Sequence, residues 1–203
     1  MKKDAHYRLP LKLINSYIWA GLTKVERAIL AVIGAYINGR NEACSLTRSE
    51  IAERVGYSLT NLSFIDNALK ELVVKHLITI KKRKGQSSLY YLTDLSRREE
   101  RKGYFQLFRY QIKGRYWAKL KPCEKTVYPV LGLKGSIKHP EIVNNPEIYC
   151  RGQIKKKKDF CRWTNLCYES LDRTLRGLEG KSLLDIDSDG NYDLYKLEVM
   201  EVK

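Results

Sequence analysis

The chain has 203 residues, of which 43% are hydrophobic, and this length and balance suit a soluble protein of two domains of about 100 residues each. No apolar run reaches the roughly 18 residues that a membrane span needs, and the N-terminal residues lack the apolar stretch of a secretion signal, so we expect a cytoplasmic protein without a membrane partner. The net charge of +15 favours polyanionic partners such as nucleic acid, although charge alone leaves open a basic protein that is merely soluble.

Two helix starts are readable near the N-terminus. The Thr-x-x-Glu pattern of a capping box occurs at Thr23 and again at Thr47, each time in front of apolar residues at helical spacing. We predict a first helix from Thr23 to about Gly39. The second helix is predicted to be short, because Gly56 is placed to end it.

A third helix and a hairpin are predicted next. Leucine and isoleucine recur with a 3-4-3 spacing on one helical face, which predicts a helix over residues 58–75. Two strand-like runs then flank the basic, Gly-containing turn KKRKG, which predicts a hairpin. The apolar face consists of Leu62, Ile65, Leu69 and Leu72.

Helix, helix, turn, longer helix and hairpin is the order of elements in a winged helix-turn-helix. The segment SLTRSEIAERVGYSLTNLSFIDNALKELVVKHLITIKKRKGQSSLYYL resembles the helix-turn-helix and wing of bacterial regulators and of plasmid or phage replication proteins. The resemblance covers about residues 20–93. It implies that the third helix enters the major groove of DNA and that the wing lies along the phosphates.

Carried onto this chain, the resemblance implies a set of DNA-binding residues. Two asparagines of the third helix would pair with adenine edges, and its phenylalanine would contact a thymine methyl group. Asp66 departs from the expected basic pattern, and phosphate would repel it. A winged helix that binds only protein remains the alternative, and a KKRK run taken alone is often a solvated surface. The implied residues are Ser58, Thr60, Asn61, Ser63, Phe64 and Asn67 on the helix, and Lys81, Lys82, Arg83 and Lys84 on the wing.

The chain then repeats itself. WAGLTKVERAILAVIG, which begins at Trp19, returns as WAKLKPCEKTVYPVLG, which begins at Trp117, an offset of 98 residues. Because the offset is a domain's length, we predict two tandem winged-helix domains in a mainly α fold with small β-hairpins, an α+β class. The expected boundaries are residues 1–95 for the first domain, 96–103 for a linker and 104–203 for the second domain.

The second copy also carries a helix-turn-helix pattern. The 3-4-3 spacing returns from Tyr168 to Leu178, and Thr164-Asn165-Leu166 echoes Thr60-Asn61-Leu62, so a second recognition helix is predicted over residues 164–179. The preceding helix is expected within residues 151–163, and residues 135–149 are expected to form a loop. A solvated helix face is the alternative to a DNA-binding surface here. The expected DNA contacts are Lys155, Lys156, Lys157, Lys158, Arg162, Thr164, Asn165 and Arg173.

The second wing differs from the first in charge, and no cofactor is expected. Residues 183–197 carry four aspartates against one lysine, so we expect this wing to turn away from DNA or to pack on protein. DIDSDG begins like a calcium loop, but Lys196 occupies the position of the bidentate glutamate, and the cysteines and histidines lack zinc spacing. We expect neither a metal nor an enzyme, because phosphate-binding glycine loops and nucleophile motifs are missing.

The combined features predict sequence-specific binding of double-stranded DNA. The module openings LKLINSYIWAGLTKVERAIL and YFQLFRYQIKGRYWAKLKPCEKTVYPVL are similar to those of tandem winged-helix replication initiators of plasmids and mobile elements, which bind repeats at an origin. This resemblance implies a nucleoid- or plasmid-associated protein. Regulators of transcription that bind an operator share the same features and remain the alternative. A protein-interaction scaffold is a second alternative, and self-association or a replication or transcription partner protein is compatible with each.

Overall fold

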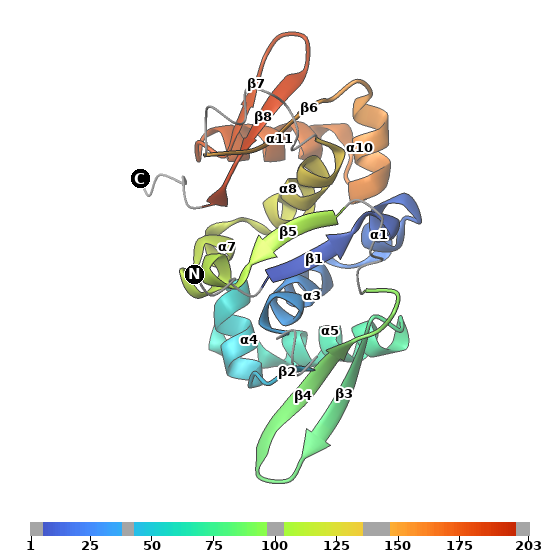
Figure 1. Ribbon diagram of the computed structural model, residues 1–203, viewed down its shortest axis with the longest axis vertical. Helices are drawn as coiled ribbons and strands as arrows, with labels where there is room; N and C mark the ends of the chain where they lie inside the picture. Colours follow the sequence, from blue (N-terminus) through green and yellow to red (C-terminus); the bar gives the residue numbers. More distant parts are fainter. Residues whose placement is uncertain (1–5, 38–42, 97–103, 136–146, 198–203) are drawn as a thin grey trace.

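The computed structural model describes residues 6–37, 43–96, 104–135 and 147–197 (Figure 1). It combines helices with small antiparallel sheets, which agrees with a mixed helix and strand class. The first half contains β1 (His6–Pro10), α1 (Leu11–Asn15), α2 (Ile18–Gly21), α3 (Lys24–Tyr36), β2 (Ala43–Cys44), α4 (Arg48–Val55), the 3-10 helix η1 (Leu59–Asn61), α5 (Leu62–Val74), β3 (Ile78–Arg83) and β4 (Gln86–Leu92). The second half contains β5 (Tyr104–Phe108), α6 (Arg109–Lys113), α7 (Tyr116–Lys119), α8 (Pro122–Lys134), β6 (Ile148–Gln153), α10 (Lys157–Thr164), α11 (Tyr168–Glu179), β7 (Leu184–Ile186) and β8 (Asn191–Tyr195).

The helix starts predicted from capping boxes are confirmed. The Thr23 hydroxyl accepts the Glu26 N–H at 3.3 Å and the Glu26 carboxylate accepts the Thr23 N–H at 2.9 Å, so α3 begins directly after Thr23. The same exchange fixes the start of α4 after Thr47, and Gly56 ends that helix in a left-handed conformation with φ of 83°. Helix α3 ends at Tyr36, earlier than predicted, and the predicted third helix divides into η1 and α5.

The repeat seen in the sequence is also a repeat of elements. Strand β5 and helices α6, α7 and α8 each begin 98 residues after β1, α1, α2 and α3 respectively. A left-handed residue precedes the short second helix in both copies, Tyr17 with φ of 58° and Arg115 with φ of 62°. Each half ends in a three-stranded antiparallel sheet, ordered β2-β4-β3 and β6-β8-β7, and the two terminal hairpins lie at opposite ends of the molecule (Figure 1).

A two-stranded antiparallel ribbon joins the halves at the centre of the molecule (Figure 1). In its register Arg8 pairs with Gln106, which is the residue 98 positions later, while Tyr7 pairs with Leu107 and Leu9 pairs with Phe105. Leu107 is the equivalent of Leu9, and Phe105 is the equivalent of Tyr7, so equivalent residues pair at the midpoint and exchange partners on either side of it. This is the pairing that a two-fold axis produces. The two halves are therefore related here by a local two-fold.

The core is continuous across both halves and explains the repeated residues. Trp19 and Trp117 are both fully buried within one apolar cluster. A Cβ on Gly34 would lie 2.3 Å from the Tyr7 ring, and one on Gly132 would lie 2.3 Å from the Phe105 ring, so glycine is required where each long helix crosses its strand. These contacts account for the tryptophan and the final glycine of the repeated motif.

Buried cations complete the interface between α3 and α8. The Arg27 guanidinium donates to the carbonyls of Trp19 at 2.7 Å and Ala20 at 2.8 Å and, across the interface, to the Thr126 hydroxyl at 2.9 Å. At the equivalent position Lys125 donates to backbone carbonyls at the end of α7. Desolvation by burial lowers the pKa of Arg27 to about 10 and that of Lys125 to about 8.

Part of the expected linker is structural, and part lies outside the described residues. Ser96, which was assigned to the linker, is buried, donates to the Leu77 carbonyl at 2.5 Å and accepts the Tyr7 hydroxyl on its own carbonyl at 3.2 Å. Residues 97–103, and 136–146 of the expected loop, are not among those described, and the loop assignment fails at Ile148 and Tyr149, which begin β6. Within the described ranges, every helix is too short or too polar to span a lipid bilayer.

Candidate nucleic-acid interface

The first half presents two helices joined by a tight turn. Apolar side chains of α4 and α5, among them Ile51 and Ile65, are buried against α3 and fix the angle of this helix pair. The turn runs through left-handed Gly56, and the Ser58 hydroxyl accepts the Thr60 N–H at 3.3 Å to start η1. A Cβ on Gly56 would lie 2.5 Å from the Ala118 carbonyl oxygen, so this turn also contacts α7 of the second half.

The side chains that sequence reasoning assigned to DNA project from this helix pair into solvent. Phe64 is 58% exposed, and Leu59, which was not predicted, is 59% exposed. Both side chains are therefore accessible to a partner. The side chain of Asn61 lies outside what the structure describes. The remaining predicted positions, Ser58, Thr60, Ser63 and Asn67, are all exposed.

A groove of about 830 Å³ lies between α4, α5 and the β3–β4 hairpin. Lys70 and Lys82 line it from the helix and from the hairpin. Asp66 also lines it, but its carboxylate lies 2.7 Å from the Arg48 guanidinium. The repulsion of phosphate expected from Asp66 is therefore offset by its own partner, and the groove has a positive balance.

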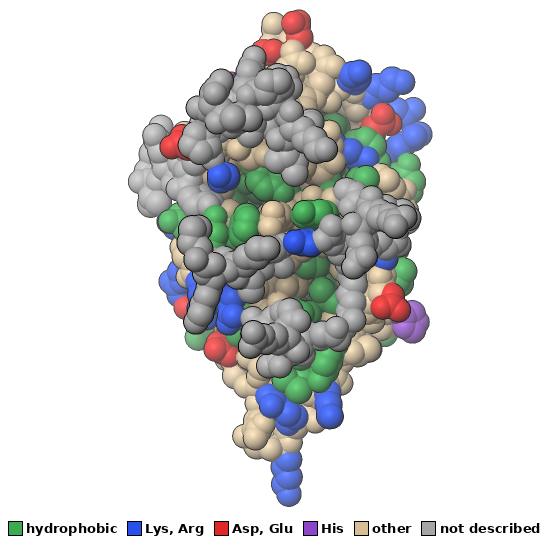
Figure 2. Space-filling view, viewed as in Figure 1, with side chains coloured by type: hydrophobic (Ala, Val, Ile, Leu, Met, Phe, Trp, Pro, Cys, Tyr) green, Lys and Arg blue, Asp and Glu red, His purple; other side chains and the backbone are tan. Residues whose placement is uncertain are grey.

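The hairpin turn carries exposed lysines at one end of the molecule, where Figure 2 shows a concentration of basic side chains. Lys81, Lys82 and Lys84 are exposed. Arg83 is different, because its guanidinium donates to the Ser87 carbonyl at 2.9 and 2.7 Å and to the Ser45 hydroxyl at 3.0 Å. Arg83 therefore holds the hairpin to the loop before α4, and its contact with phosphate stays a prediction.

The second helix pair begins elsewhere than predicted. Asn165 ends α10 in a left-handed conformation with φ of 55°, which is the role of Gly56 in the first half. Thr164 is fully buried, and its hydroxyl donates to the Phe160 carbonyl at 2.6 Å. Helix α11 starts only at Tyr168. Thr164 therefore ends α10 and Asn165 lies in the turn after it, so their assignment to a recognition helix is wrong.

The lysine run of the second half is also placed differently from the prediction. Lys155 and Lys156 precede α10, and only Lys157 and Lys158 lie in its first turn, although all four are exposed. Lys157 lies 2.8 Å from Asp172, and this ion pair is the counterpart of Arg48 with Asp66. Arg162 and Arg173, the two arginines predicted to contact DNA, are exposed.

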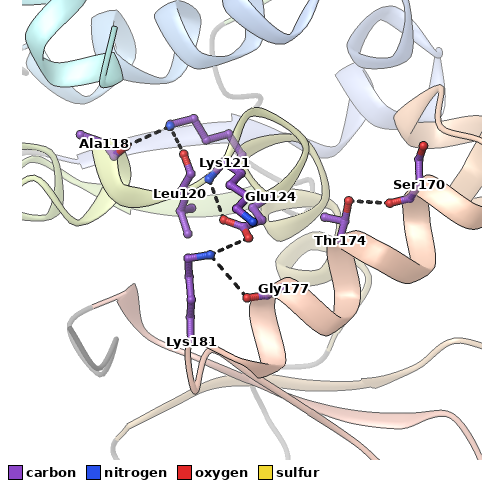
Figure 3. A network of polar contacts seen from close by, with 9 residues as sticks. Ala118, Leu120, Lys121, Glu124, Ser170, Thr174, Gly177 and Lys181 are labelled. Atoms are coloured by element: carbon purple, nitrogen blue, oxygen red, sulfur yellow. Dashed lines mark hydrogen bonds and ion pairs between the residues drawn. The ribbon is translucent and has the colours of Figure 1, made fainter. Parts of the chain in front are cut away.

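An internal ion pair holds each third helix against the long helix of its half. In the second half Lys181 donates to the Glu124 carboxylate at 2.6 Å and approaches the Gly177 carbonyl at 3.5 Å (Figure 3). In the first half Lys75 reaches Glu26 at the same 2.6 Å distance. Both carboxylates are almost completely buried, so these contacts fix where α5 and α11 sit. The repeated glutamate thus has a structural role in both copies.

The second wing is acidic and shaped by its own hydrogen bonds. The Asp187 carboxylate accepts the N–H groups of Asp189 and Asn191, each at 2.9 Å, and the Asn191 side chain at 2.8 Å, which is foremost in lowering the pKa of Asp187. Asp193 pairs with Arg151 at 2.5 Å. No group of three or more His, Cys, Asp or Glu suited to a metal occurs within the described ranges.

Two further residues of α11 belong to the second surface. Tyr168 begins the apolar 3-4-3 spacing of the sequence but is 53% exposed. Arg176 occupies the position of Lys70, 106 residues earlier, which is the offset at which the apolar spacing repeats. Comparison of the chain with protein-family models, curated proteins and solved structures returned no match.

Proposed function

We propose that each half is a winged helix-turn-helix module and that the chain binds double-stranded DNA in a sequence-specific manner. In this proposal α5 enters the major groove and the basic β3–β4 wing contacts the phosphate backbone. The observation that carries the proposal is the groove between α5 and that wing, which the exposed Lys70 and Lys82 line from the helix and from the hairpin. The second module adds α11 and the basic surface of α10, while its acidic wing turns away from DNA.

The basic wing provides the direct test. Replacing Lys81, Lys82 and Lys84 together by Ala should weaken binding to all duplex sequences alike, since phosphate contacts carry no sequence information. The slope of log affinity against log salt should become less steep by about 0.9 for each phosphate that the wing no longer neutralises. Fluorescence anisotropy with a random duplex at several salt concentrations measures both quantities.

A matched control separates the wing from overall charge. Lys24, Lys119 and Lys121 are exposed lysines outside both wings, and their replacement by Ala removes the same charge. We expect this control to leave the salt slope close to that of the original protein. Equal weakening in the two variants, or no duplex binding by the original protein at low salt, would contradict DNA binding by the wing and favour a protein-interaction scaffold.

We further propose that the chain acts as a replication initiator of a plasmid or mobile element, with transcriptional regulation as the alternative. Support for the initiator comes from the resemblance of the tandem module openings to that group. The arrangement of bound sites separates the two roles. Selection of bound sequences, followed by their location near the gene, should give directly repeated sites for an initiator and a single promoter operator for a regulator.

A further inference from the structure

A second basic site lies where the two halves meet. It is a cleft of about 660 Å³, within the size range of small-molecule sites, and is lined by α3, α4 and the sheet of the first half and by α6 of the second half. Except for Leu46 and Arg83, the residues around it differ from those of the groove beside α5. The cleft is therefore a separate feature from the surface proposed to bind DNA.

Positive charge dominates this cleft. Arg54, Arg83, Arg109 and Lys113 line it, with Glu50 as the acidic member of the lining. The Glu50 carboxylate is already occupied, because it accepts the Thr47 N–H at 2.8 Å and the Thr47 hydroxyl at 2.9 Å. Among the lining residues that the structure describes, four cations thus share the cleft with one carboxylate that caps a helix, an arrangement that favours an anionic occupant.

An aromatic ring orders two of these cations. The guanidinium carbon of Arg54 lies 5.2 Å from the centroid of the Tyr36 ring and that of Arg109 lies 4.6 Å from it. Stacking of this kind holds a guanidinium plane in place. The buried Nε of Arg54 has no hydrogen-bond partner among the described residues. Tyr91 and Leu89 supply apolar wall beside the cations.

The local two-fold supplies an internal comparison. At the equivalent place in the second half, Lys134 stands for Tyr36 and Trp163 stands for Arg54, and the Lys134 ammonium lies 3.8 Å from the Trp163 ring. The same ammonium donates to Asn15 at 3.0 Å, the residue equivalent to Lys113. A single cation with two partners therefore replaces the cluster. Since the fold is built at that place without the additional positive charges, packing alone does not require them in the first half.

We propose that this cleft binds a small oligophosphate ligand, such as a nucleoside diphosphate or triphosphate. Arg54, Arg109 and Lys113 would hold the phosphates, and Tyr91 with Leu89 would contact an attached nucleoside. Because Arg83 lines both this cleft and the groove beside α5, an occupant contacts the wing from its other side. The ligand is thereby placed to couple the wing of the first half to α6 of the second half.

The test is calorimetric titration of the DNA-free protein with ATP, with inorganic triphosphate and with inorganic phosphate. We expect saturable binding of ATP and triphosphate at one site per chain, and phosphate should bind much more weakly. Tighter binding of ATP than of triphosphate would identify a nucleoside contact, and equal binding would identify recognition of the phosphate chain alone. Lack of saturable binding by ATP and triphosphate would overturn the proposal.

Charge variants locate the site. Lys113→Glu changes an exposed residue of the cleft, and Lys24→Glu makes the same charge change at the start of α3, outside both the cleft and the groove beside α5. ATP affinity should fall at least fivefold for Lys113→Glu and less than twofold for Lys24→Glu. Arg109→Gln should also weaken binding, with Arg109→Lys restoring part of it, and circular dichroism checks that each variant is folded.

Duplex DNA provides the last arm of the experiment. Equal loss of ATP affinity in the two Glu variants would mean attraction to the basic surface in general and would overturn the proposal. Two results together would assign the cleft to the DNA surface instead. A duplex would displace ATP, and Lys113→Glu would lose as much duplex affinity as ATP affinity. Failure of DNA binding by the protein leaves the ATP titration unaffected, so the two proposals fail independently.

Discussion

Arg27 shows how much of the interface between the halves depends on one buried side chain. It makes three hydrogen bonds, two within its own half and one to Thr126 on α8. Arg27→Met would leave buried acceptors unpaired, which typically costs about 1–3 kcal/mol for each group. We expect the free energy of unfolding, measured in urea, to fall by at least about 2 kcal/mol.

Two further variants make that measurement specific. Arg27→Lys should be milder, because Lys125 at the equivalent position donates to the Ala118 and Leu120 carbonyls with a single ammonium. Lys24→Met, at an exposed position on the same helix, should change stability by no more than about 0.5 kcal/mol. If Arg27→Met unfolded at the same urea concentration as Lys24→Met, the assigned role of Arg27 would be wrong.

Cys150 links stability to alkaline pH. Burial raises its pKa from the ordinary value of 9.0 to about 12, so the folded protein keeps the thiol protonated where the unfolded chain ionises it. The stabilisation is present in full below pH 9 and is lost as the pH rises towards 12. When the pH is raised from 8 to 10.5, the decrease in the free energy of unfolding should be about 1–2 kcal/mol smaller for Cys150→Ala than for the original protein.

An exposed thiol supplies the comparison for this pH series. Cys167 is exposed at the N-cap of α11, where hydrogen bonds with Ser170 lower its pKa, so Cys167→Ala should lose at least as much stability at alkaline pH as the original protein. Urea unfolding at each pH gives the free energies directly. A Cys150→Ala variant with the same dependence on pH as Cys167→Ala would refute the assignment.

Replacement of Phe64 should lower DNA affinity and leave the free energy of unfolding nearly unchanged. Its ring is 58% exposed, so Phe64→Ala should change the free energy of unfolding by less than about 0.5 kcal/mol. If the ring contacts a thymine methyl, the variant should lose about 1–2 kcal/mol of affinity for its selected DNA site and much less for random duplex. Equal affinities of the variant and the original protein for the selected site would exclude Phe64 from the contact.

Elements with local signals were predictable from sequence, and elements that depend on distant partners were not. The starts of α3 and α4 follow from capping boxes, and the apolar stripe of α5 follows from its 3-4-3 spacing. The second helix pair was predicted at the wrong place because the described part of the second half has no counterpart of the three residues of η1. Matching Thr164-Asn165-Leu166 to Thr60-Asn61-Leu62 therefore aligned the end of α10 and the turn after it with η1 and the start of α5.

The site was predictable to a similar extent. The exposed lysines of the first wing follow from composition and from their position on a hairpin. The hydrogen bonds of Arg83 to Ser45 and Ser87, and the cleft shared with Arg109, arise from contacts between elements that only the folded chain brings together. Exposure of Phe64 could be expected from its place opposite the apolar stripe.

At the scale of the whole molecule, the continuous core predicts cooperative unfolding. The apolar cluster includes buried residues of both halves, and β1 pairs with β5 along their whole length. We expect one calorimetric transition whose van't Hoff enthalpy equals the calorimetric enthalpy. Two resolved transitions would mean that the halves unfold as independent domains and would contradict the role given to the shared interface.

The self-pairing of Arg8 with Gln106 has a consequence for how this protein changes. Its arrangement is that of a homodimer whose subunits have been fused into one polypeptide. A mutation in a homodimer alters both subunits together, whereas here each half inherits its own substitutions. One hairpin can therefore become acidic while the other stays basic, and the asymmetry persists in every molecule because the subunits can no longer exchange.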